Sequence, residues 1–420
     1  MQEASLEANQ GDQDVILLSA TGSGKTLAFL LPVIAQLDKD NKHTQALIIV
    51  PSRELALQIE QVFRSMGTGF KITSCYGGHL RETEENNLIQ PPAIIVGTPG
   101  RLADHIRRAN ITVDAITTLI LDEFDKSLEL GFTEELSFII GSLPNIQKRI
   151  LTSATQAVGV PDFVGLQEPV TLDFLHLVNE ESAGLEVQKV LSDNKDKLET
   201  LFQLICYLGN RSMIIFCNHR DAVERTSNYL SDKGINNEFY HGGMEQQQRD
   251  SALCKFRNGT TLVLVTTDLA ARGLDIPNIR YIIHYHLPDT EASFTHRNGR
   301  TARMEASGTA ILLLSGEEQV PAYVQEEVTT INLPEHSPLP EAPKWTTLFI
   351  AAGKKDKVNK IDIVGFLTQV GQLKKEDVGL IEVKDFFSFV AVRKNQANTL
   401  LPRIRDQRIK NKKVKIEVAK

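Results

Sequence analysis

Up to about residue 175, short apolar runs alternate with stretches of helical periodicity, and this alternation strongly restricts the possible folds. The runs are mostly apolar and only four to six residues long, which is typical of strands buried on both faces. A mainly parallel sheet with helices on both faces is therefore expected. The predicted strands are Asp14–Ser19, Ala46–Val50, Lys71–Tyr76, Ala93–Gly97, Thr118–Leu121 and Arg149–Thr152.

A polar segment near Leu177–Gly184 interrupts the pattern, which then resumes. The second set of predicted strands is Ser212–Phe216, Asn237–Tyr240, Leu262–Thr266, Tyr281–His284 and Thr309–Leu314. Two similar α/β domains in tandem, 1–178 and 185–333, account for both halves.

A third part of the chain, 345–420, follows a linker at 334–344 that carries four prolines. Its expected order is strand, helix, strand, strand, helix, strand, the ferredoxin-like α+β plan of many small RNA-binding (RRM-type) modules. These elements are predicted at Thr346–Ala351, Ile361–Leu373, Gly379–Val383, Phe387–Val392, Gln396–Gln407 and Val414–Val418.

Composition places the chain among soluble globular proteins, with 41% apolar and 24% charged residues. Apolar runs stay below the ~18 residues that a membrane span requires, and a signal peptide is not evident. We therefore expect a cytoplasmic monomer without a membrane partner. The cysteines are scattered, which favours reduced core thiols over disulfides or zinc ligands: Cys75, Cys206, Cys217 and Cys254.

Charge is distributed unevenly along the chain. Residues 341–420 hold 18 Lys+Arg and 9 Asp+Glu, whereas the chain as a whole carries a net charge of −7. A basic tail on an acidic body suits contact with a polyanion, although a solvated basic face would have the same composition.

A glycine-rich turn after the first predicted strand, followed by an apolar helix, is typical of a phosphate-binding loop. Gly22 and Gly24 allow backbone N–H groups to approach phosphate oxygens at the helix N-terminus. Lys25 can reach the terminal phosphates, and the Thr26 hydroxyl can ligate Mg²⁺. Ser19 stands where the strict pattern has glycine. The predicted nucleotide-binding residues of the loop are Thr21, Gly22, Ser23, Gly24, Lys25 and Thr26.

An acidic cluster follows the apolar strand Thr118–Leu121. A carboxylate at the C-terminal end of a strand, beside a phosphate loop, is where a metal-bound γ-phosphate needs one. Asp122 is expected to hold Mg²⁺ through water, and Glu123 to orient and deprotonate the attacking water. Together with Lys25, these residues predict hydrolysis of a nucleoside triphosphate.

With these motifs the chain resembles the DEAD-box RNA helicases through both α/β domains. The resemblance implies two RecA-like domains, ATP and Mg²⁺ as cofactors, and RNA-stimulated ATP hydrolysis. Further motifs in the family order are Pro51-Ser52-Arg53-Glu54-Leu55-Ala56, Gly77-Gly78, Thr98-Pro99-Gly100-Arg101, Ser153-Ala154-Thr155, Gln246…Arg249, Thr267-Asp268-Leu269-Ala270-Ala271-Arg272-Gly273-Leu274-Asp275 and His296-Arg297-Asn298-Gly299-Arg300-Thr301-Ala302-Arg303.

The resemblance also implies roles for residues of the second domain. Arg300 and Arg303 act in the family as arginine fingers on the γ-phosphate, and Gly273 and Asp275 approach the nucleotide. Coupling of hydrolysis to domain closure is implied for Asp125, Ser153, Thr155 and Arg297.

Several predicted RNA contacts lie in loops that follow successive strands of one sheet. Such loops share an edge, so their N–H groups and arginines can line a phosphate-binding track that reads no sequence. These residues are Pro51, Arg53, Gly77, Gly78, Thr98, Gly100 and Arg101, with Arg249 and Thr267 on the second domain.

The chain departs from the family pattern at four places. Phe124 replaces an alanine beside the catalytic pair, Ala302 replaces a glycine and Ser52 replaces a threonine; hydrolysis is expected to survive all three. The family reads adenine with a glutamine that is assisted by an aromatic residue further upstream. Gln2, 23 residues before Lys25, suits that glutamine, but the sequence begins too close to it to contain the aromatic residue. A start of the natural chain upstream of Met1 is our favoured explanation, and weakened nucleotide binding is the alternative.

The region 345–420 resembles the C-terminal RNA-binding domain of the DbpA-like branch of bacterial DEAD-box proteins. The run Thr347–Lys357 and the strand Ser388–Val392 carry this resemblance. It implies binding of structured ribosomal RNA of the large subunit. Phe349, Phe387 and Phe389 can stack unpaired bases if they face away from the helices, or belong to the core if they face them.

Lysines, among them Lys354 and Lys355, are expected to supply phosphate attraction in this domain. The predicted function is an ATP-dependent RNA helicase that unwinds or remodels structured RNA, with ribosomal RNA of large-subunit assembly as its target. A non-processive ATP-gated RNA-binding clamp without strand separation is the alternative, and a DNA translocase is disfavoured by the motif set.

Overall fold

Each α/β half of the chain folds around a seven-stranded parallel sheet in the computed structural model. The structure describes residues 1–20, 23–154, 159–175, 185–268, 279–299, 308–325, 327–405, 407–410 and 412–419. The chain divides into two compact units, of which the first ends at Gly184 and the second contains the other sheet and the C-terminal domain. The predicted fold class is confirmed.

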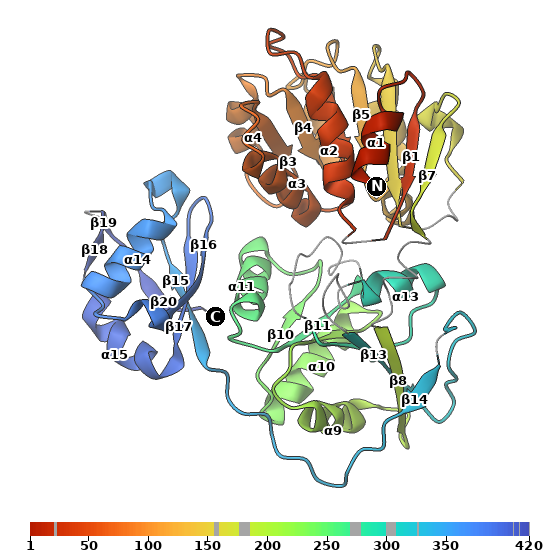
Figure 1. Cartoon of the computed structure of the whole chain (residues 1–420). Helices are drawn as coiled ribbons and strands as arrows, with labels where there is room; N and C mark the ends of the chain where they lie inside the picture. The colour runs from red at the N-terminus through yellow and green to blue at the C-terminus, as the bar shows by residue number, and fades with distance from the viewer. Residues whose placement is uncertain are drawn as a thin grey trace. The chain divides into compact units, whose positions relative to one another are not determined.

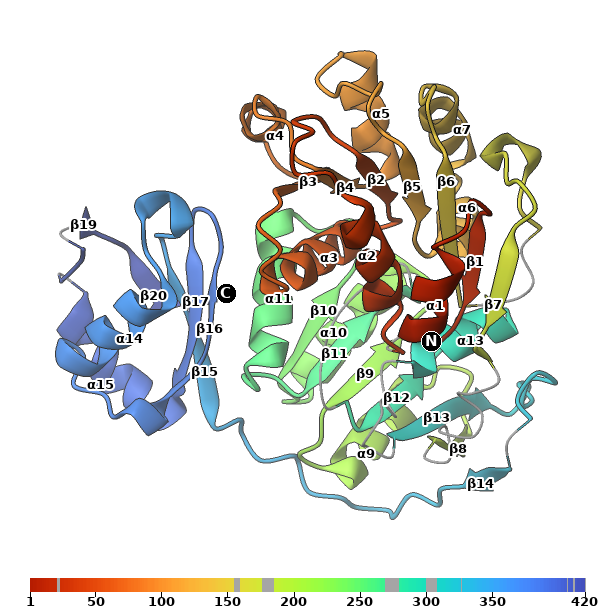
Figure 2. The same ribbon diagram turned by 45° about the horizontal axis from the view of Figure 1, so that its top comes forward.

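The first sheet has the order β3-β4-β2-β5-β6-β1-β7, which can be read from left to right in Figure 2. Its strands are β1 (Val15–Leu18), β2 (Ala46–Ile49), β3 (Ile72–Cys75), β4 (Ile94–Gly97), β5 (Thr118–Leu121), β6 (Lys148–Ser153) and β7 (Val170–Asp173). The helical segments are α1 (Gln2–Ala8), α2 (Lys25–Gln36), α3 (Arg53–Ser65), α4 (Arg81–Leu88), α5 (Pro99–Arg107), α6 (Phe124–Glu129), α7 (Thr133–Gly141) and the 3₁₀ turn η1 (Asp162–Val164).

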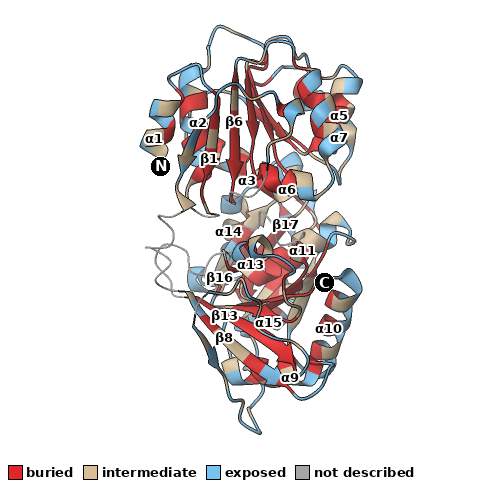
Figure 3. Cartoon of the chain, turned by 90° about the vertical axis from the view of Figure 1, so that its right-hand side faces the viewer, coloured by how far each residue is buried: buried red, intermediate tan, exposed pale blue. Residues whose placement is uncertain are grey.

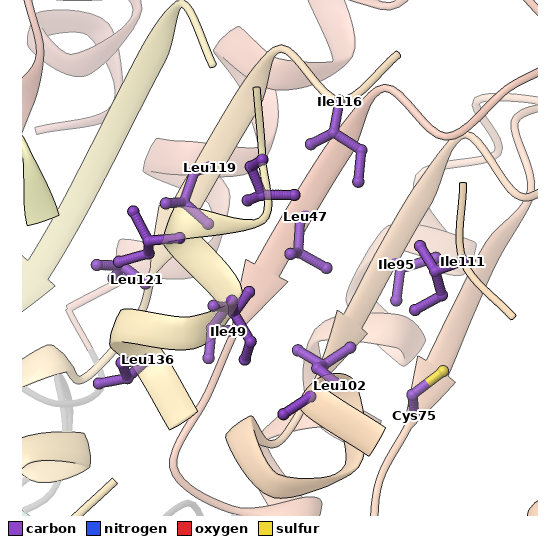
Figure 4. Close-up of a cluster of buried hydrophobic side chains, with 14 of the residues drawn as sticks. Leu47, Ile49, Cys75, Ile95, Leu102, Ile111, Ile116, Leu119, Leu121 and Leu136 are labelled. Carbon is purple, nitrogen blue, oxygen red and sulfur yellow. The ribbon is translucent and has the colours of Figure 1, made fainter. Parts of the chain in front are cut away.

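Alternation along the strands explains why both faces of this sheet are covered. Ala46 and Ile48 of β2 pack with α2 and α3 on one face, the face turned to the viewer in Figure 1. Leu47 and Ile49 of the same strand point to the other face and pack with α5 and α7, as the close-up in Figure 4 shows for the labelled side chains. Successive side chains of a strand point to opposite faces, so a continuous apolar run buries both.

The second sheet repeats this topology with the order β10-β11-β9-β12-β13-β8-β14, again all parallel. Strands β9, β11, β12 and β13 are buried along almost their whole length, as the red arrows in Figure 3 show, whereas β8, β10 and β14 are partly exposed. The strands of this sheet are β8 (Leu185–Ser192), β9 (Met213–Phe216), β10 (Asn237–Tyr240), β11 (Val263–Thr266), β12 (Tyr281–His284), β13 (Gly308–Ser315) and β14 (Val328–Thr330). The described helices are α9 (Leu198–Leu208), α10 (Arg220–Asp232), α11 (Gln246–Arg257) and α13 (Glu291–Asn298).

The C-terminal domain is a four-stranded antiparallel sheet of order β16-β17-β15-β20. Its segments are β15 (Trp345–Ile350), η2 (Lys354–Asp356), α14 (Lys360–Gln369), η3 (Lys375–Asp377), β16 (Val378–Val383), β17 (Ser388–Arg393), α15 (Lys394–Ile404), β18 (Arg408–Ile409), β19 (Lys412–Lys413) and β20 (Ile416–Val418). Leu348, Val390 and Val392 face α14 and α15 and form the core with Phe366 and Leu400.

Helix α11 covers the other face of this C-terminal sheet. Cys254 of α11 packs on Phe389, and both are fully buried. Polar contacts surround this apolar centre: the Thr347 hydroxyl lies 3.2 Å from Asn258 Nδ2 and 2.7 Å from Thr260 Oγ1, and Arg257 pairs with Glu382 at 3.3 Å. The C-terminal domain is therefore held on the second sheet domain by an apolar contact with a polar rim.

The four cysteines are free and buried, so their predicted place in the core is confirmed. In the part of the chain that the structure describes, none of the helices is long and apolar enough to cross a membrane.

Reversal of the charge at Arg257 should loosen the contact between α11 and the C-terminal sheet. An Arg257→Glu variant places like charges against Glu382, and we expect alkylation of the Cys254 thiol to become at least about fivefold faster, as for the loss of a coupling of ~1 kcal/mol. Peptide mapping of iodoacetamide-treated full-length protein measures this rate, with the core thiol Cys217 as internal reference. The double variant Arg257→Glu/Glu382→Arg should restore protection; unchanged labelling in the single variant would contradict the contact.

Candidate nucleotide and RNA site

The phosphate loop lies between β1 and α2, as predicted. Gly24 is the N-cap of α2 and has φ +94°, a conformation that suits glycine. A Cβ at Gly24 would also lie only 2.5 Å from Gln2 Nε2. Two roles of Gly24 thus coincide: it starts the helix and leaves room for Gln2 of α1. Thr21 and Gly22 of this loop lie outside the described residues.

Lys25 is buried at the start of α2, and its ammonium group donates to the Ser19 carbonyl at 2.8 Å. Ser19 Oγ donates to Ser23 Oγ at 2.6 Å, which in turn donates to the Ala20 carbonyl at 2.8 Å. Serine at position 19 therefore adds a hydrogen bond within the loop that glycine could not make. Thr26 follows in the first helical turn with its side chain half-buried.

Helix α1 is anchored so that Gln2 reaches the phosphate loop. Ser5 Oγ donates to the Ala28 carbonyl of α2 at 2.7 Å, and Gln36 Nε2 donates to the Asn9 carbonyl at 3.0 Å. These bonds place Gln2 Nε2 3.5 Å from the Gly24 carbonyl. Gln2 thus lies against the phosphate loop, and its reading of adenine stays a prediction.

The acidic pair follows β5 at the same edge of the sheet. The Thr152 hydroxyl of the neighbouring strand β6 donates to Asp122 Oδ1 and accepts the Glu123 backbone N–H at 3.1 Å. Burial raises the pKa of Asp122, while the charge of Lys25 and the Thr152 hydrogen bond oppose this shift. Thr152 is a site residue that sequence reasoning missed, although it directly precedes the motif Ser153-Ala154-Thr155.

Glu123 has an unusual backbone: φ +49° and ψ 49°, in the left-handed region, as N-cap of α6. A non-glycine residue there is strained by roughly 1–2 kcal/mol, which the surrounding structure has to supply. Within the described part of the chain, Glu123 Oε2 is buried and has no hydrogen-bond partner. An acceptor of this kind is suited to a water molecule, as a general base requires.

Phe124 points away from the acidic pair. Its side chain is buried in the apolar cluster that contains Leu121, Leu136 and Leu151. The bulky residue at the family's alanine position thus belongs to the core, and Asp122 and Glu123 keep their hydrogen bonds to Thr152. Similarly, Ser52 is accommodated as N-cap of α3 and accepts the Leu55 N–H at 3.3 Å.

The predicted RNA-binding loops of the first domain meet at the C-terminal edge of the sheet, because β3, β4 and β2 are adjacent and parallel. Arg53 begins α3 and its guanidinium lies 4.7 Å from the centre of the Tyr76 ring. Gly77 and Gly78 are exposed after β3. Pro51 follows β2 and Thr98 follows β4, whereas Gly100 and Arg101, expected in a loop, lie in the first turn of α5.

Arg101 is held by Glu84, a second residue that sequence reasoning missed. Glu84 is buried in α4 and accepts hydrogen bonds from Arg101 Nη1 at 2.7 Å and His105 Nε2 at 2.7 Å. His79 Nε2 lies 3.0 Å from it, and the Tyr76 N–H donates at 2.7 Å. Burial would raise the pKa of Glu84, but these hydrogen bonds outweigh it and lower the pKa to about 2.

The same buried cluster contains three groups that metals often bind, Cys75, Glu84 and His105, with ligand atoms within 4.8 Å of one another. However, Glu84 already accepts hydrogen bonds from two histidines, an arginine and a backbone N–H. The cluster is therefore fully explained as a hydrogen-bonded support for Arg101 and the loop after β3.

In the second domain, Arg249 of α11 donates to Tyr240 Oη at 2.9 Å, and Thr267 follows β11. Arg297 of α13 is 2% exposed and donates to Asp268 Oδ2 at 2.8 Å and to the His286 carbonyl at 2.6 Å. The predicted coupling residue Arg297 thus fixes the segment after β11 to the end of β12.

The structure also places two coupling residues of the first domain. Asp125 lies buried in α6, and Ser153 ends β6, where its carbonyl accepts the Ser19 N–H at 3.0 Å. The predicted roles of the remaining residues concern positions outside the described part of the chain: Thr155, Gly273, Asp275, Arg300 and Arg303.

The three aromatic residues of the C-terminal sheet share the face turned away from α14 and α15, so their assignment to that helix-facing core is excluded. Phe389 is 1% exposed because α11 covers it. Phe349 and Phe387 are half-buried beside it. Stacking on Phe389 is therefore not possible in this arrangement. Lys354 and Lys355 are exposed, and their contact with RNA stays a prediction.

Comparison with known families gives three matches in chain order. A DEAD/DEAH box helicase model matches residues 1–163, a helicase conserved C-terminal domain model 196–305, and a DbpA RNA binding domain model 347–418. These matches define a DEAD-box helicase core that carries a DbpA-type RNA-binding domain.

Two similar relatives match over the whole length of this chain. The ATP-dependent RNA helicase DbpA of Escherichia coli (strain K12) is 32% identical over 431 residues, with 100% of this chain and 94% of the relative covered. DbpA of Bacillus subtilis (strain 168) is 30% identical over 455 residues, again with 100% and 94% covered. The chain belongs to the DbpA family of DEAD-box ATP-dependent RNA helicases.

Solved structures of helicase cores resemble the fold. S. cerevisiae Dbp5 bound to RNA and ADP BeF3 matches with a TM-score of 0.68 and 27% identity, covering 79% of this chain and 88% of Dbp5. Mss116 bound to ssRNA and UDP-BeF matches with a TM-score of 0.66 and 26% identity, covering 79% and 74%.

Replacement of Glu84 should weaken RNA binding through Arg101. In Glu84→Gln the charge that holds Arg101 is lost, and we expect RNA affinity to fall about fivefold, the effect of one charge-assisted hydrogen bond of ~1 kcal/mol. Fluorescence anisotropy with a single-stranded RNA measures this, and Glu82→Gln, an exposed neighbour on the same helix, should have no effect.

The same variant tests the depressed pKa of Glu84. The stabilisation from a carboxylate whose folded pKa is lowered to about 2 is present above about pH 4.5 and is lost as the pH falls towards 2. Urea unfolding should therefore show a smaller loss of stability over this range in Glu84→Gln than in the wild type. The role of Glu84 would be contradicted if Glu84→Gln bound RNA as tightly as Glu82→Gln and lost as much stability at low pH as the wild type.

Proposed function

We propose that this helicase remodels structured ribosomal RNA during assembly of the large ribosomal subunit, as a monomer in the cytoplasm. The observation that carries the proposal is the DbpA RNA binding domain match over residues 347–418, joined to a helicase core. The excess of 18 Lys+Arg over 9 Asp+Glu in 341–420 supports an RNA partner for this domain.

The chemistry proposed for the core is attack of water on the γ-phosphorus of ATP. Glu123 takes the proton of that water through its unpartnered buried oxygen, ADP leaves, and Lys25 neutralises charge on the phosphates. The Thr26 hydroxyl and the Asp122 carboxylate would hold Mg²⁺, which supplies positive charge to the β- and γ-phosphate oxygens. The donor set fits this ion, because a hydroxyl and a carboxylate supply the oxygen ligands that Mg²⁺ prefers.

Removal of the Glu123 carboxylate should abolish turnover but leave nucleotide binding. For Glu123→Gln we expect RNA-stimulated phosphate release to fall by about 100-fold or more, the usual contribution of a general base. The matched control is Glu134→Gln on the exposed face of α7, which should hydrolyse ATP like the wild type. Turnover in Glu123→Gln close to that of the control would contradict the assignment.

The RNA target is tested in cells by crosslinking of the full-length protein and sequencing of the bound RNA. We expect reads concentrated at one structured region of large-subunit ribosomal RNA. Reads spread over messenger RNAs would contradict the proposal.

The alternative activity, an ATP-gated clamp, is distinguished from a helicase by a duplex-unwinding assay, since a clamp would hydrolyse ATP without displacing a strand.

A further inference from the structure

The covered face of the C-terminal sheet raises the question of where this domain binds RNA bases. Phe389, at its centre, is closed off by Cys254 of α11, and the Thr347 hydroxyl on the same face is engaged by Asn258 and Thr260. Bases could stack on Phe389 only if the domain left α11, and Phe349 and Phe387 beside it are half-buried. A more exposed aromatic ring of this domain lies off the sheet face.

The turn between β16 and β17 carries this ring. Phe386 lies in this turn and is 62% exposed, while its neighbours Phe387 and Phe389 are turned to the covered face. A rigid exposed aromatic ring offers a stacking surface for an unpaired base of any sequence.

Two exposed lysines lie against this turn. The Lys354 N–H donates to the Lys384 carbonyl at 2.9 Å, and the Lys355 N–H donates to the Asp385 carbonyl at 2.8 Å. The packing is close: a Cβ on Gly353 would lie 2.3 Å from the Lys384 carbonyl oxygen. The two turns thus form one rigid corner, with an aromatic ring and two ammonium groups in solvent.

Charge around the corner remains favourable for a nucleic acid. Asp385 is exposed, but Asp356 is paired with Lys412, and Lys357 is a further exposed lysine of the same turn. The Asp385 carboxylate can accept hydrogen bonds from base N–H groups, which offers discrimination among bases rather than attraction.

The corner also adjoins the RNA-binding part of the helicase core. Lys384 Nζ lies 3.8 Å from Asp250 Oδ1, and Asp250 directly follows Arg249 on α11. The corner therefore contacts the same turn of α11 that carries the predicted RNA contact Arg249.

We infer that Phe386, with Lys354 and Lys355, forms the base-stacking site of the C-terminal domain for unpaired nucleotides of a structured RNA. This inference rests on the proposed RNA-remodelling function and names the site that holds the target. Phe386 supplies the stacking surface, the lysines contact phosphates on either side of the stacked base, and the sheet face serves only to hold the domain on α11.

The test uses full-length protein and a fluorescein-labelled pool of RNA hairpins with an eight-nucleotide randomised loop, in the absence of ATP. Phe386→Ala should bind the pool about 5- to 100-fold more weakly, the loss of one stacked base. Phe386→Trp should bind at least as tightly as the wild type, and Phe386→Leu should resemble the alanine variant, because only an aromatic ring stacks. Ile361→Ala removes an equally exposed apolar residue, 81% exposed, and should change nothing.

A second measurement concerns the lysines. In Lys354→Gln/Lys355→Gln the slope of log affinity against log salt should decrease by about 1 to 2, as two phosphate contacts are lost. Equal binding by the alanine and tryptophan variants at position 386, or base crosslinks at Phe387 and Phe389 instead, would overturn the inference. RNA-stimulated ATP hydrolysis by the wild type tests the proposed function separately: with that activity present and the Phe386 variants unaffected, the inference alone fails.

Discussion

Parallel pairing of the strands is the constraint on which the site depends. Because the strands of the first sheet run in one direction, the segments after β1, β2, β3, β4 and β5 emerge at the same edge. The phosphate loop and the acidic pair thereby share an edge with Arg53, Gly77 and Arg101. Along this one edge, the sheet can thus carry the residues predicted for ATP hydrolysis beside those predicted to contact the RNA backbone.

Buried charge is the second requirement of this edge. Asp122, Glu123 and Glu84 are each almost inaccessible, and burial of a carboxylate without partners costs several kcal/mol. For Glu84 this cost is offset by hydrogen bonds from two histidines, an arginine and a backbone N–H, and the residue supports Arg101. For Glu123 it is not offset in this way, since one of its oxygens is unpartnered and its backbone is strained. Glu84 is therefore a structural carboxylate, whereas the Glu123 carboxylate is available for a reaction.

Sequence reasoning recovered the elements whose signal is local. Continuous apolar runs identified β2, β4 and β5 to within a residue or two, and the glycine loop placed Lys25 correctly. Strands β7, β8 and β14 were not predicted, because they are partly exposed near the sheet edges and carry no continuous buried run. Glu84 lies in the polar helix sequence Arg81–Leu88, where nothing distinguishes it from exposed Glu82. Its burial comes from Arg101 and His105, which only the tertiary fold brings to it.

The aromatic residues of the C-terminal domain also show that local sequence does not predict tertiary contacts. Strand alternation puts Phe387 and Phe389 on one face, but it left open whether that face is turned to α14 and α15 or away from them, and it cannot reveal what covers the face. The cover is α11, a helix about 130 residues earlier in the chain, whose first turn carries Arg249 and whose last turns carry Cys254 and Arg257. One helix therefore links Arg249, a predicted RNA contact of the core, to the C-terminal domain. Through an RNA bound by both, the domain can direct the core to a neighbouring segment of the same RNA.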